Sequence, residues 1–309
     1  FNAFNIANGG TTKFSNKKRH EKKDPYIVSM SSPCYGLINL MPTIFLQCSR
    51  DSMNNSPFLA ASVAPAEVAH FSDCADEWWS QRGIFGVLHD LIPLRLRYVM
   101  TQCDAFGVQK KDSKKSFEDL CILDMGCGGG LMTEALAQQG ARITAVDASA
   151  KAIDVAQKHA QKSGLEIDYR VGTAEALAQE KKRFDVIVAL EIVEHVADLD
   201  SFMRALSALL KPEGLLILST LNRTTSSFLL GTVMAEYVLG WVPAGTHDWD
   251  KFVRPSELAA LCEKNKMMPV DVTGLVYRPL WRRFELCQAK TKVNYFMTVR
   301  KEKKEIRKP

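Results

Sequence analysis

A short apolar run that leads directly into a glycine-rich turn restricts the fold of this chain more than any other feature of its sequence. Residues 121–124 have the composition of a buried strand, Gly126, Gly128 and Gly130 follow at alternate positions, and a helical pattern starts at Leu131. Glycine lets a ligand approach the backbone closely, and the first N–H groups of a helix can bind a carboxylate or a phosphate. The pattern therefore predicts a nucleotide-like cofactor beyond the carboxyl ends of parallel strands.

The spacing within this turn separates two kinds of cofactor. A dinucleotide fingerprint, G-x-G-x-x-G, starting at Gly126 would need glycine or alanine at position 131, where the chain has Leu131. The pattern Asp-x-Gly-x-Gly-x-Gly from Asp124 to Gly130 instead resembles the first motif of class I methyltransferases, which use S-adenosylmethionine. This resemblance implies that Asp124, Gly126, Gly128 and Gly130 hold that cofactor.

The next apolar run, residues 142–147, ends in the acidic residue Asp147. A carboxylate at this position can accept hydrogen bonds from both ribose hydroxyls of a bound nucleoside. Because NAD carries the same ribose, Asp147 predicts a nucleoside without identifying it. A turn that served only the geometry of the sheet would rarely carry three alternate glycines, since each one costs backbone entropy.

Strand patterns and helical patterns alternate from residue 120 onwards. We expect strands at 120–124, 142–147, 166–170, 185–190, 215–220, 270–276 and 294–299, and helices at 131–139, 151–163 and 199–210. Apolar strands separated by helices of roughly ten residues are typical of a doubly wound, mostly parallel sheet. The predicted fold class is α/β with a Rossmann-like sheet, a helical N-terminal extension and an apolar insertion after the fifth strand.

Polar residues directly follow the fourth predicted strand, which ends at Leu190. Glu191, Glu194 and His195 have the spacings i, i+3 and i+4, so a single helical turn would place the three side chains on one side. Two carboxylates and an imidazole could bind a divalent cation, and His195 alone could act as a general base. A solvated acidic turn with an incidental histidine is the alternative.

Residues 66 to 300 closely resemble the ubiquinone-biosynthesis O-methyltransferases of bacteria and mitochondria. The similar stretches follow one another along the chain: Phe71–Trp79, Ile92–Leu96, Asp124–Gly130, Glu191–His195, Ser219–Arg223, Ala235–Leu239, Gly245–Asp248, Pro255–Leu258, Asp271–Gly274 and Val293–Tyr295. The resemblance implies an S-adenosylmethionine-dependent O-methyltransferase that acts on a polyprenylated catechol or quinol. Methylation of another phenol or catechol, or a non-catalytic scaffold that binds S-adenosylmethionine, are the alternatives.

The same resemblance implies roles for single residues. Contacts to S-adenosylmethionine are implied for Arg95, Gly126, Asp147 and Leu190, and binding of Mg²⁺ or a similar divalent cation for Glu191, Glu194 and His195. The guanidinium of Arg95 could pair with the methionine carboxylate through two hydrogen bonds, although a solvated helix position is the alternative. A cation or a base suits this chemistry, because a phenol with a pKa of about 10 is a weak nucleophile at neutral pH.

Composition divides the chain into segments. Residues 1–65 contain many serines and asparagines, a basic cluster at 13–24 and three acidic side chains, which is typical of a disordered or targeting segment. We expect the methyltransferase domain at 66–300, with a helical cap at 66–116 and an insertion at 221–254, and a basic tail at 301–309. We interpret residues 1–65 as an organellar transit peptide, with plain disorder as the alternative. This interpretation and the family resemblance favour a mitochondrial protein, peripheral on the matrix side of the inner membrane.

The insertion is the expected membrane contact. Residues 226–241 are apolar and aromatic with a single charged residue, Glu236, and such a segment suits a membrane interface. A helix packed on the domain or a dimer contact is the alternative. The expected partners are a polyprenylated aromatic substrate, the membrane surface and other ubiquinone-biosynthesis proteins.

Charge and cysteine content exclude two other classes of protein. The net charge of +5 arises from residues 13–24 and 301–309, so the predicted domain has no excess of basic residues and we expect no nucleic acid as a partner. The eight cysteines include no C-x-x-C pair, which indicates reduced thiols and no zinc site.

Overall fold

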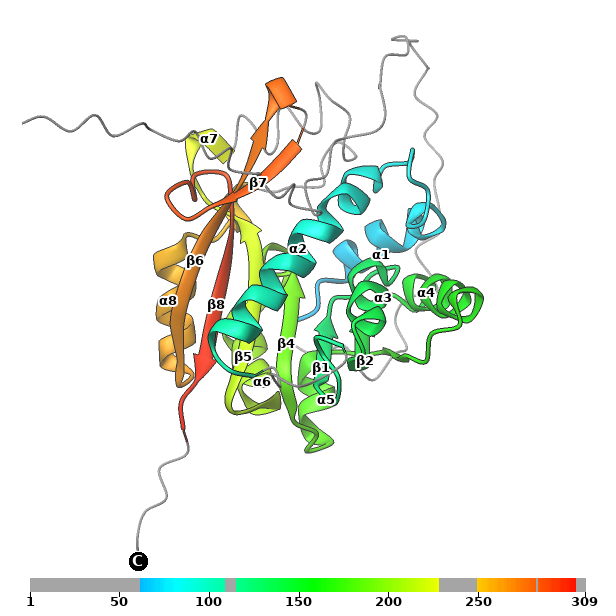
Figure 1. The fold of residues 1–309 in the computed structure, drawn as a ribbon, viewed down its shortest axis with the longest axis horizontal. Coiled ribbons are helices and arrows are strands. Elements are labelled where there is room, and N and C mark those ends of the chain that lie inside the picture. The colour runs from blue at the N-terminus through cyan, green and yellow to red at the C-terminus, as the bar shows by residue number, and fades with distance from the viewer. Residues whose placement is uncertain (1–61, 109–114, 228–248, 282, 304–309) are drawn as a thin grey trace, which may run out of the picture.

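The computed structural model describes residues 62–108, 115–227, 249–281 and 283–303, and a single sheet forms its centre (Figure 1). The strands are β1 Cys121–Met125, β2 Arg142–Asp147, β3 Asp168–Val171, β4 Phe184–Leu190, β5 Leu210–Leu221, β6 Met267–Arg278, β7 Arg283–Cys287 and β8 Asn294–Lys301. They lie in the order β3-β2-β1-β4-β5-β8-β6-β7. The first five strands pair in parallel, whereas β8, β6 and β7 continue the sheet in antiparallel pairs.

Helices cover both faces of this sheet (Figure 1). One face carries α2 Gly86–Ala105, α3 Leu131–Gln138 and α4 Ala150–Ser163, and the other carries α5 Ala174–Gln179, α6 Leu199–Leu209 and α8 Pro255–Lys264. Helix α1, Pro65–Asp73, and the 3-10 helix η1, Ala75–Glu77, precede α2 and contact α4. The predicted doubly wound α/β fold with a helical N-terminal extension is therefore confirmed.

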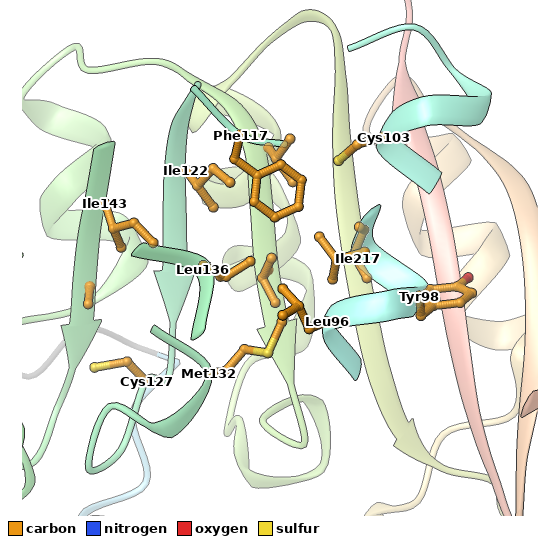
Figure 2. Packing of buried hydrophobic residues seen from close by; sticks show 14 of the residues in the cluster. Leu96, Tyr98, Cys103, Phe117, Ile122, Cys127, Met132, Leu136, Ile143 and Ile217 are labelled. Atoms are coloured by element: carbon orange, nitrogen blue, oxygen red, sulfur yellow. The ribbon is translucent and has the colours of Figure 1, made fainter. Parts of the chain in front are cut away.

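Alternate residues of the strands supply the two halves of the core. Ile122 on β1 packs toward α2 and α3, whereas the next residue, Leu123, packs toward α5 and α6. Figure 2 shows the first half, with Ile122 and Ile143 of the sheet beside Leu136 of α3 and Leu96 of α2. Each fully buried aliphatic side chain of this kind stabilises the fold by about 1.5–3 kcal/mol. This packing fixes the common edge at which β1, β2 and β4 end.

The starts of three helices follow from local sequence. Ser149, Thr173 and Asp198 stand just before α4, α5 and α6, and each side chain accepts a hydrogen bond from a backbone N–H in the first turn. Such caps satisfy N–H groups that have no partner within the helix. Helices α4 and α5 thereby begin close to the ends of β2 and β3, which keeps these two connecting loops short.

Two strands, β5 and β7, differ from the sequence-based expectation. Strand β5 begins at Leu210 and not at residue 215, because Leu210 already pairs with Phe184 before an irregularity in the ladder. Strand β7 was not expected. Its five residues are half-buried on both sides, so they lack the alternation that identifies a strand with one buried face.

Several predictions fall outside the described residues. These are the targeting segment up to residue 61, positions 228–248 of the insertion, and positions 304–309 of the basic tail. Within the described part of the chain, no helix is both long enough and apolar enough to cross a bilayer. The six cysteines described there are all free, as the predicted reduced state requires.

Candidate active site

A cavity of about 1070 Å³ lies at the edge where β1, β2 and β4 end. This volume is at the upper end of the range for small-molecule sites, so the cavity has room for a cofactor and a second ligand. Most of the predicted cofactor residues line it, namely Arg95, Asp124, Gly126, Gly128, Asp147 and Leu190. Gly130 does not; it precedes α3 and faces the hydroxyl of Tyr169.

The glycine turn has a backbone that only glycine adopts without strain. Gly126, Gly128 and Gly130 have φ angles of 77°, 51° and 86°. A Cβ on Gly126 would overlap the side chain of Ile192, and one on Gly128 would overlap the indole ring of Trp78. The alternate glycines are therefore required by the packing of the chain itself, in addition to any ligand.

Two carboxylates, that of the buried Asp124 and that of the half-buried Asp147, hold the turn in place. Asp147 accepts hydrogen bonds from the N–H of Gly128 at 2.9 Å and of Ser149 at 2.8 Å, so it joins the turn to the start of α4. Burial raises the pKa of Asp147, and these N–H groups oppose the rise. Asp124 accepts a hydrogen bond from the hydroxyl of Thr133 at 2.5 Å, and burial raises its pKa to about 6. Both side chains also line the cavity.

The segment after β4 is not the single helical turn expected from the spacing of its polar residues. Glu191 has a φ of 51°, in the left-handed region, and only Val193–His195 form a 3-10 helix, η2. The N–H of Glu191 donates to the backbone oxygen of Ser219 on β5 at 3.0 Å, which holds this conformation. The expectation that Glu191, Glu194 and His195 share one helix face is therefore wrong, because the sheet and not a helix fixes Glu191.

Glu191 lines the cavity and forms a network with three polar side chains. Its carboxylate lies 3.2 Å from Nη2 of Arg95, accepts a hydrogen bond from Ser219 at 2.7 Å, and accepts two from Asn294 at 3.1 and 3.2 Å. The side chain of Arg95 is only 7% exposed. Arg95 is thus a buried cavity residue and not the solvated helix position that the sequence left open.

The side chain of Glu194 does not face the cavity. It is buried, and its Oε2 accepts a hydrogen bond from the hydroxyl of Thr220 at 2.6 Å. Burial, together with the neighbouring charge of Glu191, raises the pKa of Glu194 to about 7. Its Oε1 has no partner among the described residues, so ionisation of this carboxyl group is unfavourable.

His195 lines the cavity beside helix α1. Its Nδ1 lies 3.0 Å from Oε2 of Glu67, whose other oxygen accepts a hydrogen bond from Lys251 at 2.8 Å. The hydrogen bond with His195 is the main cause that lowers the pKa of Glu67 to about 2. Burial opposes a charge on His195, but Glu67 and the carboxylates of Glu194 and Glu191 outweigh it and raise the pKa of the imidazole.

A backbone contact holds α1 next to this histidine. Val63 and Val196 form an isolated antiparallel bridge, and the oxygen of Ser62 accepts a hydrogen bond from the N–H of Ala197 at 2.9 Å. The start of α1 is thereby attached to the residues that directly follow His195. Sequence reasoning missed Glu67, because nothing in the sequence of α1 shows which part of the chain this helix packs against.

The predicted metal ligands do not converge. Glu191 pairs with Arg95, Glu194 with Thr220 and His195 with Glu67. Across the described residues, no group of three histidine, cysteine or acidic side chains is arranged to hold a metal ion. These residues in their present positions do not fit a bound cation, and their metal-binding role stays a prediction.

Fold and site together define a class I methyltransferase that uses S-adenosylmethionine. Residues 123–218 match the family described as methyltransferase domain. A solved structure of magnesium protoporphyrin IX methyltransferase from Synechocystis PCC 6803, with bound SAH, has the same fold. It is 18% identical in sequence, and the match has a TM-score of 0.52 and covers 76% of this chain and 100% of that one.

Closer relatives identify the family. The ubiquinone biosynthesis O-methyltransferase of Cereibacter sphaeroides is 46% identical over 236 residues, which cover 76% of this chain and 96% of the relative. The proteins of the same name from Brucella anthropi and Methylocella silvestris are each 44% identical, covering 76% and 79% of this chain and 95% and 96% of the relatives. The chain belongs to the ubiquinone biosynthesis O-methyltransferase family.

Proposed function

We propose that this enzyme methylates a hydroxyl group of a polyprenylated catechol or quinol in ubiquinone biosynthesis. One observation carries the proposal: the glycine turn, His195 and an apolar wall that includes Val276, Tyr277 and Phe284 line the same cavity. An apolar, partly aromatic wall suits an aromatic ring that bears a prenyl tail. The names of the bacterial relatives support the pathway.

The chemistry requires that a proton leave the acceptor hydroxyl. S-adenosylmethionine supplies an electrophilic methyl group when it is bound. The carboxylate of Glu67 favours the tautomer of His195 with hydrogen on Nδ1, which leaves Nε2 as the ring nitrogen that can accept a proton. We assign the acceptor proton to this Nε2, and Glu67 then stabilises the imidazolium that forms. Because Glu67 raises the pKa of His195, it also makes the imidazole a stronger base.

A role for Mg²⁺ or a similar divalent cation is supported only by the residue types, the two carboxylates and one imidazole of Glu191, Glu194 and His195. Their present partners would have to be exchanged before all three could be ligands. The proton transfer to His195 needs no such rearrangement. Activity measured with and without a chelator separates cation-assisted methyl transfer from base catalysis by His195. Loss of turnover on chelation would support a cation, and full activity would assign the chemistry to His195 alone.

We also propose that the enzyme acts in mitochondria, on the matrix side of the inner membrane, beside other proteins of the pathway. The composition of residues 1–65 and the apolar character of residues 226–241 support this location. Import of the full chain into isolated mitochondria, followed by alkaline extraction of the membranes, tests it. Protein that stays outside the organelle would contradict the proposal.

The experiment for the activity compares methyl transfer from labelled S-adenosylmethionine to a polyprenylated catechol and to the same ring without its tail. We expect the tailed substrate to be preferred, and His195→Gln to lower kcat by about 100-fold or more while cofactor binding persists. His159→Gln is the matched control, since His159 does not line the cavity. Equal rates on both rings would favour another phenol as substrate, and cofactor binding without any turnover would favour a scaffold.

A further inference from the structure

We propose that the tip of the β6–β7 hairpin docks the enzyme on an anionic phospholipid bilayer. The hairpin tip is the 3-10 helix η5, Pro279–Trp281, and all three of its side chains are exposed. Leu280 is 84% exposed and Trp281 is 58% exposed. This inference rests on the proposed function, because a polyprenyl tail keeps the substrate in a membrane.

The composition of the hairpin tip is unusual for a turn between two strands. Turns favour glycine, asparagine and aspartate, which adopt tight backbone angles and interact well with water. Single exposed apolar residues are ordinary, but Leu280 and Trp281 are adjacent and follow a proline at the end of a projecting hairpin (Figure 1). Tryptophan is also enriched at the interface between membrane and water.

The hairpin tip lies at the rim of the cavity. Tyr277 and Pro279 on one side of the hairpin and Phe284 on the other line the cavity, whereas Leu280 and Trp281 between them do not. A bilayer that received the exposed pair would therefore meet the apolar wall of the cavity. A substrate with its tail in the bilayer could reach the site along that wall without passing through water.

The charge around the hairpin tip matches an anionic surface. Residues 278–292 contain five basic side chains and one acidic one, Glu285. Glu285 is already paired with Arg278 at 2.8 Å and with Arg283 at 2.6 Å. Lys290 and Lys292 are exposed and line the cavity, on the loop that follows the hairpin. Each basic side chain close to an anionic bilayer strengthens binding by about fivefold.

A second copy of the chain is a less suitable occupant. Stable protein interfaces bury about 800 Å² on each partner, which a tip of three residues does not approach.

The guanidinium of Arg283 lies 5.7 Å from the ring centroid of Trp281. A basic group beside an interfacial aromatic ring suits lipid headgroups above an apolar layer.

Binding of the full chain to vesicles tests the proposal. Vesicles of phosphatidylcholine with about 30% phosphatidylglycerol are compared with pure phosphatidylcholine, and bound protein is measured by co-sedimentation. We expect Leu280→Ser combined with Trp281→Ser to lower the partition coefficient on the anionic vesicles by about tenfold or more. Met268→Ser is the matched control, because Met268 is also 58% exposed but lies at the opposite end of β6. The control should bind like the native protein.

Two further measurements separate this inference from the proposed function. The double variant should bind S-adenosylmethionine and methylate a catechol without a tail at native rates, but should methylate the tailed substrate in vesicles more slowly. Absence of turnover on any catechol by the native enzyme would refute the proposed function and leave the vesicle result intact. Equal vesicle binding by the native protein and the double variant overturns the docking proposal. If the variant then also differs from the native protein in oligomeric state, the hairpin tip is instead a contact between two copies of the chain.

Discussion

Replacing Glu67 by glutamine tests how helix α1 controls the site. The amide keeps the shape of the side chain but removes the charge that faces His195 and Lys251. The lowered pKa of Glu67, about 2 against 4.5, corresponds to about 3.5 kcal/mol if every pKa unit counts fully at about 1.4 kcal/mol. Because the side chain of Glu67 is 21% exposed and that of Lys251 45%, solvent screens the pair. We therefore expect the free energy of unfolding to fall by about 1–2 kcal/mol near pH 7.

The pH dependence of the effect has a definite sign. The stability that Glu67 contributes is present above its ordinary pKa of 4.5 and is lost as the pH falls toward 2. The raised pKa of His195 contributes stability below its ordinary value of 6.5, which is lost as the pH rises through the folded-state pKa. The difference between native and variant protein should therefore be largest between these two ordinary values and smaller on either side. Calorimetry across this range should show a fall in Tm of about 2 to 8 °C at the maximum.

The same substitution should alter catalysis. Without the charge of Glu67 the pKa of His195 falls, so the acid limb of the pH–rate profile moves to lower pH and kcat falls by about tenfold. Lys251→Met is the matched control, because it removes one partner of Glu67 but leaves the contact with His195. It should lower stability without moving the acid limb. An unchanged profile in Glu67→Gln, or an equal shift in Lys251→Met, would refute the reasoning.

Three further predictions concern two residues of the cavity wall and the buried carboxyl group of Glu194. Gly128→Ala introduces a Cβ that overlaps Trp78 at a left-handed φ, and we expect cofactor affinity measured by titration calorimetry to fall by about 100-fold. Arg95→Met removes a buried positive charge from the cavity wall and should weaken binding of S-adenosylmethionine by about tenfold or more in the same assay. Glu194 has a folded pKa of about 7, so the native protein loses stability as the pH rises from 4.5 to 7. Glu194→Gln escapes this loss, and its Tm relative to native should rise by several degrees between about pH 5 and about pH 8.

Features that depend on neighbouring residues could be predicted from the sequence. The glycine turn, the acidic end of β2 and the alternation of strands and helices are each encoded within a few residues, and the structure places Gly126, Gly128 and Asp147 in one cavity. The position of Glu191 could not be predicted, because the spacing argument presupposed a helix, whereas the hydrogen bond that its N–H donates to Ser219 of β5 fixes its left-handed backbone.

Features that depend on distant contacts were not predictable. Glu67 and His195 are 128 residues apart, and their contact follows from the docking of α1 on the loop after β4. The hairpin tip was missed for another reason. Strand β7 is short and half-buried on both sides, so neither its existence nor the projection of Leu280 and Trp281 is visible in the hydrophobic pattern.

The indole ring of Trp78 gives the enzyme a built-in optical reporter. The ring covers the backbone of Gly128 and stacks on Phe85 with the ring centroids 4.0 Å apart, and it lines the cavity. A nucleoside that entered beside the glycine turn would change the polarity around this chromophore. Intrinsic fluorescence, compared between the native protein and Trp78→Phe, would therefore follow the filling of the cavity in real time without any attached dye.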